Sequence, residues 1–440
     1  MNTNDLLNQW STLSLEEIEA QLTSPDVAQA ARKLYGVKPV HQMRAVSMER
    51  AISPRAAGAA EPVVLLPGIM GSLLSSIRGV TTLLWINPAV FLQGKGNYLD
   101  LNAAGTDDAD PTVEVVPVGI EKLFYLKISL TLRREAQLYE FPFDWRRTIE
   151  ASADVLHDRL ERWAGGDPNR KFTLLGHSMG GIVSRAYLTR HPREAERRIK
   201  RVITLGTPFF GAAGAIENMI NGNDMMALAQ SINSGNVPQR MLLSFPSVYQ
   251  LLPAPPDLFP ASRPYPANWD LYQANAWHWS PIRQDYLDLT RASHAALHRN
   301  VPDVEHTQIA GCNASTTTDM VQTFDANEKA SFEVVKQDKG PDGGDATVPL
   351  WSSVLPGAQM YYVNEKHRYL PGNDKVIAGV LELLNGGKPK LAKTIPPAPS
   401  GIFRAEREFV STDAEADELR RKLEAGTASG ADLGKLYFAL

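Results

Sequence analysis

A serine lies between two glycines at the end of a short apolar run. Residues 171–175 (Lys-Phe-Thr-Leu-Leu) lead into Gly-His-Ser-Met-Gly at 176–180, and a helix-compatible stretch follows at 181–188. A serine hydroxyl becomes a nucleophile when a neighbouring base takes its proton, and it can then attack an ester carbonyl. The glycines allow a sharp strand-to-helix turn that exposes the hydroxyl of Ser178. The pattern predicts acyl-transfer chemistry at Ser178; the alternative is a glycine-rich loop without catalysis.

The strand, turn and helix together predict an α/β-hydrolase fold, a mostly parallel central sheet flanked by helices, with inserted lid or cap regions. In this fold the acid and then the base follow the serine along the chain. Asp345 lies in a turn before an apolar segment, and His367 follows a strand predicted at 360–363. We therefore predict that His367 takes the proton of Ser178, while Asp345 orients His367 and stabilises its charged form.

Other residues compete for these two roles. Asp342 lies close to Asp345 in the sequence, but Asp345 stands beside the Thr-Val-Pro that begins the next element, so Asp345 is favoured and Asp342 is assigned to a turn. The chain has nine histidines, and His367 is the one that follows Asp345. His177 is adjacent to the nucleophile, and we interpret it as structural or as part of the pocket wall.

The negative oxygen of a tetrahedral intermediate needs backbone N–H donors. In this fold one donor is the residue after the nucleophile, here Met179, and the other lies in the loop after an early strand. Residues 61–66 predict that strand and 67–72 the loop, in which Ile69 is the expected donor and Met70 the neighbour with which it could be confused. This chemistry needs no cofactor and no metal, and the sequence has no cysteine–histidine spacing typical of a metal site.

Several motifs resemble, in order and spacing, those of the lecithin:cholesterol acyltransferase family, which includes lysosomal phospholipase A2 and the phospholipid:diacylglycerol acyltransferases. They are PGIMGS at 67–72, LWIN at 84–87, FDWR at 143–146, GHSMGG at 176–181, LGTP at 205–208, FPSVYQLLP at 245–253 and GDATVPLW at 344–351. The resemblance implies acyl-enzyme chemistry on phospholipids or other lipid esters. It also implies Ser178, Asp345 and His367 as the triad, with Ile69 and Met179 at the oxyanion positions.

The chain departs from the animal members of that family in two ways. Cys312 is its one cysteine, so no intrachain disulfide can form, whereas those secreted enzymes carry disulfides. The acid motif reads Gly-Asp-Ala at 344–346, where Gly-Asp-Gly is common. These departures suggest a bacterial relative and put a lipoprotein or lysosomal setting in doubt, but they leave the predicted triad unchanged.

Composition limits the partners. With 43% hydrophobic and 21% charged residues, the 440-residue chain is typical of a globular protein. A net charge of −4 argues against nucleic acid or an anionic membrane surface as an electrostatic partner. The sequence shows no secretory signal and no apolar run long enough to span a membrane. The expected location is therefore cytoplasmic, although export without a signal would look the same.

The sequence divides into three regions. Residues 1–55 predict a helical extension, 56–388 the α/β-hydrolase domain, and 389–440 a linker with a helical tail. In the extension, Ser14 and Glu17 form a capping-box pattern, and a second helix is predicted to open after Ser24. The terminal helices are candidates for assembly with another chain.

Two insertions interrupt the predicted domain. Residues from about 73 to 135 carry short apparent strands at 83–86 and 112–116, and residues from about 211 to 300 lose the alternation of strand and helix. The second insertion lies where lids occur, and its methionines and aromatics suit a flexible acyl pocket that contacts a lipid surface. They equally suit a small core of the insertion itself. Arg146 is expected to form a structural ion pair near the site, with a substrate-orienting role as the alternative.

These observations favour a serine acyl hydrolase or acyltransferase acting on lipid esters. One alternative is a carboxylesterase or lactonase for a bulky non-lipid ester. Another, from a different class, is a non-catalytic assembly module whose terminal helices carry its function. The complete set of triad and oxyanion motifs argues against the assembly module.

Overall fold

A parallel sheet lies at the centre of the computed structural model, which describes residues 3–52, 61–78, 82–85, 87–221, 233, 235, 237–279, 281–299, 301–338, 340–398, 413–425, 427–429 and 432. Within these residues the sheet has six strands in the order β11-β8-β7-β6-β1-β5, and all neighbours run parallel. The strands are β1 (Pro62–Leu66), β5 (Gln137–Glu140), β6 (Phe172–His177), β7 (Ile199–Leu205), β8 (Glu305–Gly311) and β11 (Gln359–Val363). The predicted α/β-hydrolase fold is confirmed, with the strand before Ser178 inside the sheet.

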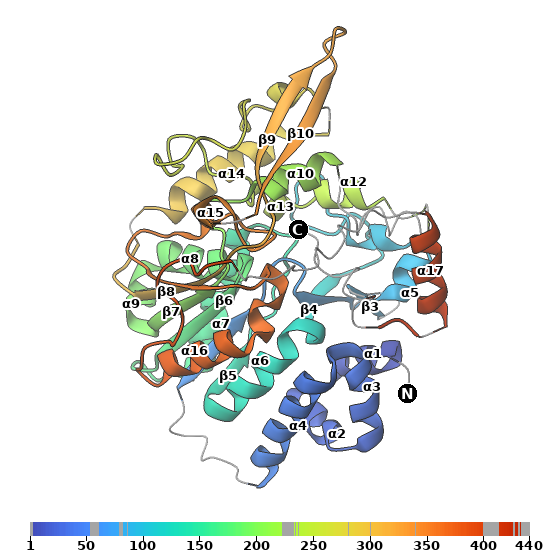
Figure 1. The fold of residues 1–440 in the computed structure, drawn as a ribbon, viewed down its shortest axis with the longest axis vertical. Helices are drawn as coiled ribbons and strands as arrows, with labels where there is room; N and C mark the ends of the chain where they lie inside the picture. The colour runs from blue at the N-terminus through green and yellow to red at the C-terminus, as the bar shows by residue number, and fades with distance from the viewer. Residues whose placement is uncertain are drawn as a thin grey trace.

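Helices cover both faces of this sheet (Figure 1). In β1, Val63 and Leu65 belong to an apolar cluster with residues of α6 (Lys122–Glu135) and α16 (Asp374–Leu384). Val64 and Leu66 belong to a second cluster with residues of α7 (Ile149–Ala164) and α8 (Met179–Arg190), and α9 (Pro192–Arg198) leads on to β7. A sheet covered on both faces has strands that are nearly continuous apolar runs, which is why they can be recognised in the sequence.

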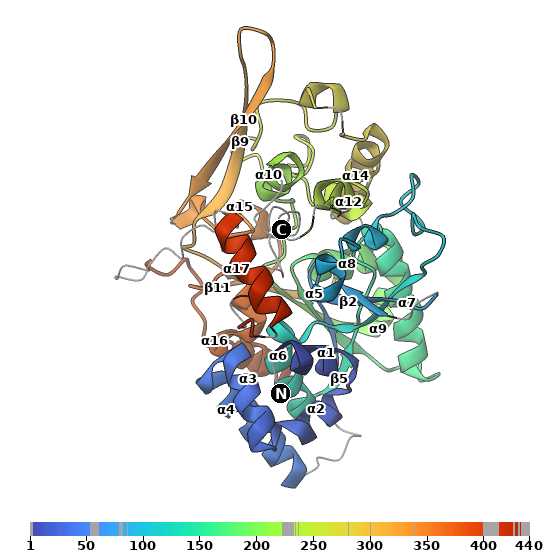
Figure 2. The same cartoon turned by 90° about the vertical axis from the view of Figure 1, so that its right-hand side faces the viewer.

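Helices also form the N-terminal region: α1 (Thr3–Thr12), α2 (Leu15–Leu22), α3 (Pro25–Tyr35) and α4 (Val37–Ile52). The predicted capping box of Ser14 and Glu17 is present, and α3 starts at Pro25. Helices α1, α2 and α4 contact α6, and the Tyr35 hydroxyl donates a hydrogen bond to the Lys122 carbonyl (3.1 Å). Figure 2 shows this group of helices next to α6. Residues 53–55 of the predicted extension lie outside the described residues.

The first insertion forms a three-stranded antiparallel sheet in the order β3-β2-β4. Its elements are β2 (Ser72–Ser76), β3 (Thr82–Trp85), α5 (Pro88–Leu92), η1 (Gly96–Leu99) and β4 (Val115–Ile120). The strand predicted from residue 112 begins instead at Val115. The Asp110 carboxylate accepts a hydrogen bond from the Thr112 N–H (2.8 Å), and this local bond holds the segment in a turn.

The second insertion consists of short and longer helices joined by turns and irregular segments where the structure describes it. It contains α10 (Ala213–Asn221), α12 (Pro238–Leu243), α13 (Pro246–Tyr249), η2 (Ala274–Trp277) and α14 (Gln284–Leu297), and these elements lie above the central sheet in Figure 1. Met225 and Met226, two of the methionines that suggested an acyl pocket, lie outside the described residues.

A long antiparallel hairpin of β9 (Thr316–Phe324) and β10 (Ala330–Gln337) projects from the top of the molecule in Figure 1. It has no counterpart among the elements predicted from the sequence. The chain then passes through η3 (Gly340–Asp342), α15 (Leu350–Ser353), β11 and η4 (His367–Gly372) to α16. The hairpin therefore lies between β8 and the predicted acid, Asp345.

The C-terminal helix α17 (Asp413–Glu424) buries Leu419 and Leu423 in the same apolar cluster as Leu6 of α1. The Thr3 hydroxyl donates a hydrogen bond to the Ala428 carbonyl, so the N-terminal helices and the C-terminal segment are in contact. Of the predicted linker and helical tail, residues 399–412 and, apart from residue 432, residues 431–440 lie outside the described residues. Nowhere in the described residues is there a helix with both the length and the apolar character to cross a membrane.

Arg146 joins the first insertion to the core. Its fully buried guanidinium donates hydrogen bonds to both carboxylate oxygens of Asp144 (2.9 and 2.8 Å), to Asp108 Oδ1 (2.8 Å) and to the Leu99 carbonyl (3.0 Å). These partners all belong to the protein's own framework. The contacts support the structural interpretation of Arg146 over the substrate-orienting one.

We predict that Arg146→Ala lowers the free energy of unfolding by about 3–5 kcal/mol, because it leaves the largely buried carboxylate of Asp108 without a cation and Asp144 with Arg147 alone (3.2 Å). Urea denaturation followed by circular dichroism measures the change. The control is Arg78→Ala, since the ion pair of Arg78 with Glu114 (3.2 Å) is largely exposed and is expected to contribute at most about 1 kcal/mol. Equal losses in the two variants would contradict the structural role.

Candidate active site

Ser178 lies between β6 and α8 with a φ of 52° and a ψ of −124°. A positive φ is strained for a residue with a Cβ and persists only where neighbours fix it. Here the Ser178 N–H donates to the Leu205 carbonyl (2.9 Å), and the Ser178 carbonyl accepts from the Gly181 N–H (2.9 Å) and the Thr207 hydroxyl (3.0 Å). The backbone of the predicted nucleophile is therefore held on both sides.

Three glycines around Ser178 let α8 approach the strand ends. A Cβ added to Gly176 would lie 2.5 Å from the Gly181 nitrogen, and one on Gly180 would lie 2.5 Å from the Pro67 carbonyl oxygen. A Cβ on Gly181 would overlap the Thr207 hydroxyl. Each of these separations is too short for any side chain, so the motif's glycines follow from packing and not from flexibility.

Asp345 and His367 are in direct contact. His367 Nδ1 lies 2.7 Å from Asp345 Oδ2, and the His367 N–H donates to the Asp345 carbonyl (2.7 Å). The other carboxylate oxygen of Asp345 accepts hydrogen bonds from the N–H groups of Thr347 (3.1 Å) and Val348 (2.7 Å). Asp345 is 1% exposed, whereas the Asp342 side chain is 59% exposed. The structure thus pairs His367 with Asp345 and not with Asp342.

The Asp345–His367 pair lies next to the serine turn. A Cβ on Gly206 would lie 3.0 Å from both Asp345 Oδ2 and His367 Nδ1, and the preceding residue, Leu205, accepts the Ser178 N–H. Because Asp345 occupies Nδ1, the Nε2 atom of His367 remains for proton transfer. The structure therefore gathers the three predicted triad residues around the carboxyl end of β7.

The loop after β1 lies against the nucleophile. A Cβ on Gly68 would lie 2.9 Å from Ser178 Cβ and 3.5 Å from its Oγ. The Gly71 N–H donates to the Gly68 carbonyl (3.0 Å) and closes a tight turn, in which Met70 has a φ of 61°. The Trp85 ring N–H fixes this strained residue by donating to the Met70 carbonyl (2.7 Å).

The two predicted oxyanion donors come from two segments: Ile69 from the loop after β1, and Met179 from the start of α8. Ile69 follows Gly68, whose Cα faces the serine side chain. Met179 is the first residue of α8, and the first N–H groups of a helix have no partner within the helix. Both predicted donors therefore belong to segments that border Ser178.

Tyr125 also borders the site and was not identified from the sequence. Its hydroxyl lies 2.6 Å from His177 Nδ1 and accepts a hydrogen bond from the Gly68 N–H (2.9 Å). Burial, and then the neighbouring His367, hold the pKa of His177 well below its ordinary value. No motif marks Tyr125, because the contact joins residues 52 positions apart in the chain.

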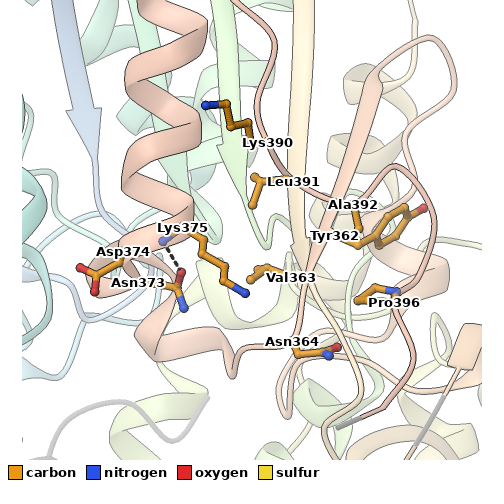
Figure 3. Close-up of a pocket in the computed structure, with 10 residues that line it drawn as sticks. All are labelled: Tyr362, Val363, Asn364, Asn373, Asp374, Lys375, Lys390, Leu391, Ala392 and Pro396. Carbon is orange, nitrogen blue, oxygen red and sulfur yellow. Dashed lines mark hydrogen bonds between the residues drawn. The ribbon is translucent and has the colours of Figure 1, made fainter.

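A cavity of about 350 Å³ lies behind the loop that leads to His367 (Figure 3). Its lining includes Val363, Asn364, Asn373 and Lys375, but none of the predicted site residues. Asn373 caps α16 by accepting the Lys375 N–H (2.8 Å). The cavity is therefore not part of the predicted active site. In the described parts of the chain, no group of three or more histidine, cysteine, aspartate or glutamate side chains is arranged to hold a metal ion.

Comparison with known proteins places these features in a family. The sequence pattern that defines lecithin:cholesterol acyltransferases matches residues 122–375, more than half of the chain. The chain belongs to the lecithin:cholesterol acyltransferase family. The matched segment contains Ser178, Asp345 and His367, whereas the predicted oxyanion loop at 67–72 precedes it.

Two members from Arabidopsis thaliana are similar to this lecithin:cholesterol acyltransferase family protein. "Lecithin-cholesterol acyltransferase-like 4" is 24% identical over 231 residues, which are 44% of this chain and 43% of that protein. "Phospholipase A(1) LCAT3" is 24% identical over 235 residues, 44% of this chain and 52% of that protein. The chain thus spans about half the length of the curated relatives it matches. Among solved structures, a chain of the Tle4-Tli4 complex is 14% identical with a TM-score of 0.47, covering 74% of this chain and 99% of that chain.

One departure from the family's common acid motif has a structural consequence. Ala346, which stands where glycine is common, has a φ of 76°. The Thr316 hydroxyl accepts its N–H (2.9 Å), so the base of the β9–β10 hairpin holds this turn beside Asp345. A left-handed conformation costs a residue with a Cβ about 1–2 kcal/mol. The turn therefore carries strain that glycine would not.

We predict that Ala346→Gly raises the free energy of unfolding by about 0.5–1 kcal/mol, the relief of strain less the greater entropy of glycine in the unfolded chain. Chemical denaturation measures the change. The control is Ala292→Gly at an exposed position inside α14, where the same substitution should cost about 1 kcal/mol. A loss of stability in both variants would show that Ala346 is not strained.

Proposed function

We propose that this protein is a serine acyl hydrolase or acyltransferase that acts on lipid esters. The observation that carries the proposal is the buried Asp345–His367 pair beside Ser178, a serine held at a positive φ by its neighbours. Family membership supports the same reaction class. No step of the proposed reaction requires a cofactor.

In the proposed mechanism the Ser178 hydroxyl attacks the ester carbonyl while His367 Nε2 takes its proton. Asp345 keeps the His367 ring oriented through Nδ1 and stabilises the imidazolium. The amides of Ile69 and Met179 donate to the oxyanion. His367 then protonates the departing alcohol, and water or an acceptor alcohol resolves the acyl-enzyme by the same steps in reverse.

Two observations favour a lipid ester over other esters. One of the similar Arabidopsis proteins is named as a phospholipase A(1). The helical insertion of residues 211–300 also packs on the catalytic core, where α14 contacts α8, the helix that begins after Ser178. We propose that this insertion serves as the lid and as the contact with a lipid surface.

The test is hydrolysis of a p-nitrophenyl ester series from acetyl to palmitoyl, together with phosphatidylcholine vesicles, by the full chain and by Ser178→Ala. We expect activity on long-chain esters or vesicles that falls at least about a thousandfold in Ser178→Ala. The matched control is Ser184→Ala, also on α8, whose hydroxyl donates only to the Gly180 carbonyl within its own helix (2.8 Å). Ser184→Ala should keep full activity.

Each outcome separates the candidate functions. Preference for short acyl chains with no reaction on vesicles would replace the lipid substrate with a carboxylesterase or lactonase function. Equal activity in wild type and Ser178→Ala would disprove the serine mechanism. It would favour the alternative of a non-catalytic assembly module. Added long-chain alcohol distinguishes transfer from hydrolysis, because a transferase forms the new ester at the expense of free fatty acid.

A further inference from the structure

A chain of three buried hydrogen bonds connects the two sides of the candidate site. The Gly68 N–H donates to the Tyr125 hydroxyl (2.9 Å), the Tyr125 hydroxyl lies 2.6 Å from His177 Nδ1, and His177 Nε2 lies 3.1 Å from the His367 carbonyl oxygen. Tyr125 is 1% exposed and His177 is 3% exposed. Neither side chain performs a step of the proposed mechanism, so both need another explanation.

Chemistry fixes the direction of these bonds. A carbonyl oxygen only accepts, so His177 Nε2 must carry a hydrogen and donate it to the His367 carbonyl. Burial, followed by the neighbouring His367, keeps the pKa of His177 well below its ordinary value, which favours the neutral form of His177. Its Nδ1 is then an acceptor, and the Tyr125 hydroxyl donates its hydrogen bond to that atom. All three bonds therefore run from Gly68 toward His367.

We propose that Tyr125 and His177 are positioning residues that hold the oxyanion loop and the His367 turn at a fixed separation across Ser178. This inference rests on the proposed acyl-transfer function. His177 of the Gly-His-Ser-Met-Gly motif and Tyr125 of α6 would then share one positioning role.

The first consequence concerns the oxyanion loop. The Gly68 N–H is bonded to Tyr125, and the Gly68 carbonyl accepts the Gly71 N–H (3.0 Å). In a trans peptide the carbonyl of Gly68 and the N–H of Ile69 point in opposite directions. Fixing Gly68 on both sides therefore fixes the direction of the Ile69 N–H, the predicted oxyanion donor. An amide that is already aimed needs no reorganisation when the negative charge forms.

The second consequence concerns the base. The His367 N–H donates to the Asp345 carbonyl (2.7 Å), and its carbonyl accepts from His177. The two rings lie side by side, with centroids 4.8 Å apart. His367 is thus restrained through its backbone as well as through Nδ1. Its Nε2 keeps its direction when the Ser178 proton is transferred.

Helix α6, which carries Tyr125, is itself held from two sides. The Tyr35 hydroxyl of α3 donates to the Lys122 carbonyl (3.1 Å), and Lys127 donates to the Gly372 carbonyl (3.0 Å) at the end of the His367 turn. In Figures 1 and 2, α6 lies between the N-terminal helices and α16. Tyr125 therefore projects from a fixed frame and not from a mobile loop.

The experiment compares kcat and KM of Tyr125→Phe with those of wild type on the best substrate of the ester series. We expect kcat to fall about tenfold, equivalent to about 1.4 kcal/mol in activation free energy. KM should stay within about twofold, because the lost orientation matters in the transition state more than in substrate binding. The matched control is Tyr187→Phe: Tyr187 is also a fully buried tyrosine, on the helix that follows Ser178, and no hydrogen-bond partner for its hydroxyl is found among the described residues.

Two His177 variants test the chain without changing Tyr125. His177→Gln keeps a donor near the former Nε2 position, and His177→Asn keeps an acceptor near the former Nδ1 position, so each preserves one link and removes the other. Both should lower kcat. Tyr125→Phe combined with His177→Gln should cost less than the product of the two single losses, because the residues act as one unit.

The outcomes are distinguishable. If Ser178→Ala abolishes turnover but Tyr125→Phe and both His177 variants match Tyr187→Phe in kcat, the positioning role is wrong and the proposed function stands. If kcat falls together with a comparable loss of folded protein by circular dichroism, or if KM rises by the same factor, the residues are merely structural and the inference fails. Unchanged activity in Ser178→Ala would overturn the proposed function itself.

Discussion

The close packing of α8 on the ends of β1 and β7 is the constraint on which the rest of the site depends. It forces Ser178 to a φ of 52° and leaves no room for a Cβ at Gly176, Gly180 or Gly181. The parallel sheet brings the other site segments close to Ser178, because loops that leave neighbouring parallel strands emerge at the same edge. The predicted oxyanion loop follows β1, Ser178 follows β6, and His367, the predicted base, follows β11. The packing of α8 on the strand ends thus fixes the position of Ser178, around which the other site segments lie.

Charge within the site is organised by backbone amides. Asp345 is almost fully buried, and a buried carboxylate is stable as an anion only when it is hydrogen-bonded. Its Oδ1 accepts from the N–H groups of Thr347 and Val348, which leaves Oδ2 for His367. The proposed mechanism uses this arrangement, because Oδ2 of Asp345 lies 2.7 Å from the ring nitrogen of His367. His177, close to the same ring, stays neutral, so it supports His367 without opposing its protonation.

The sequence predicted the parts of this structure that are local. A serine between glycines, an acid in a turn and a histidine after the last core strand lie in short motifs. Chain order selected His367, and the neighbouring Thr-Val-Pro selected Asp345 over Asp342. Of the core strands, β1, β6 and β11 were visible as short apolar runs, whereas β5 and β8, which contain several polar residues, were not predicted. The β9–β10 hairpin was missed although residues 318–323 alternate between buried and more exposed positions, because such alternation is a weak signal in a loop between core elements. Tyr125 was missed because its role depends on how α6 crosses the sheet, which no short motif encodes.

Reaction type and substrate choice have different structural origins in this protein. The predicted triad residues lie near strand ends of the core, whereas both insertions and the hairpin leave the sheet after β1, β7 and β8. The second insertion is attached to the core through Gln250, which accepts the Ile149 N–H (2.8 Å) and donates to the Glu150 carboxylate (2.7 Å). Segments anchored at their base can change at their far ends without disturbing the sheet. Members of the family can therefore share the acyl-transfer chemistry of the core and differ in the acyl group and acceptor that their insertions admit.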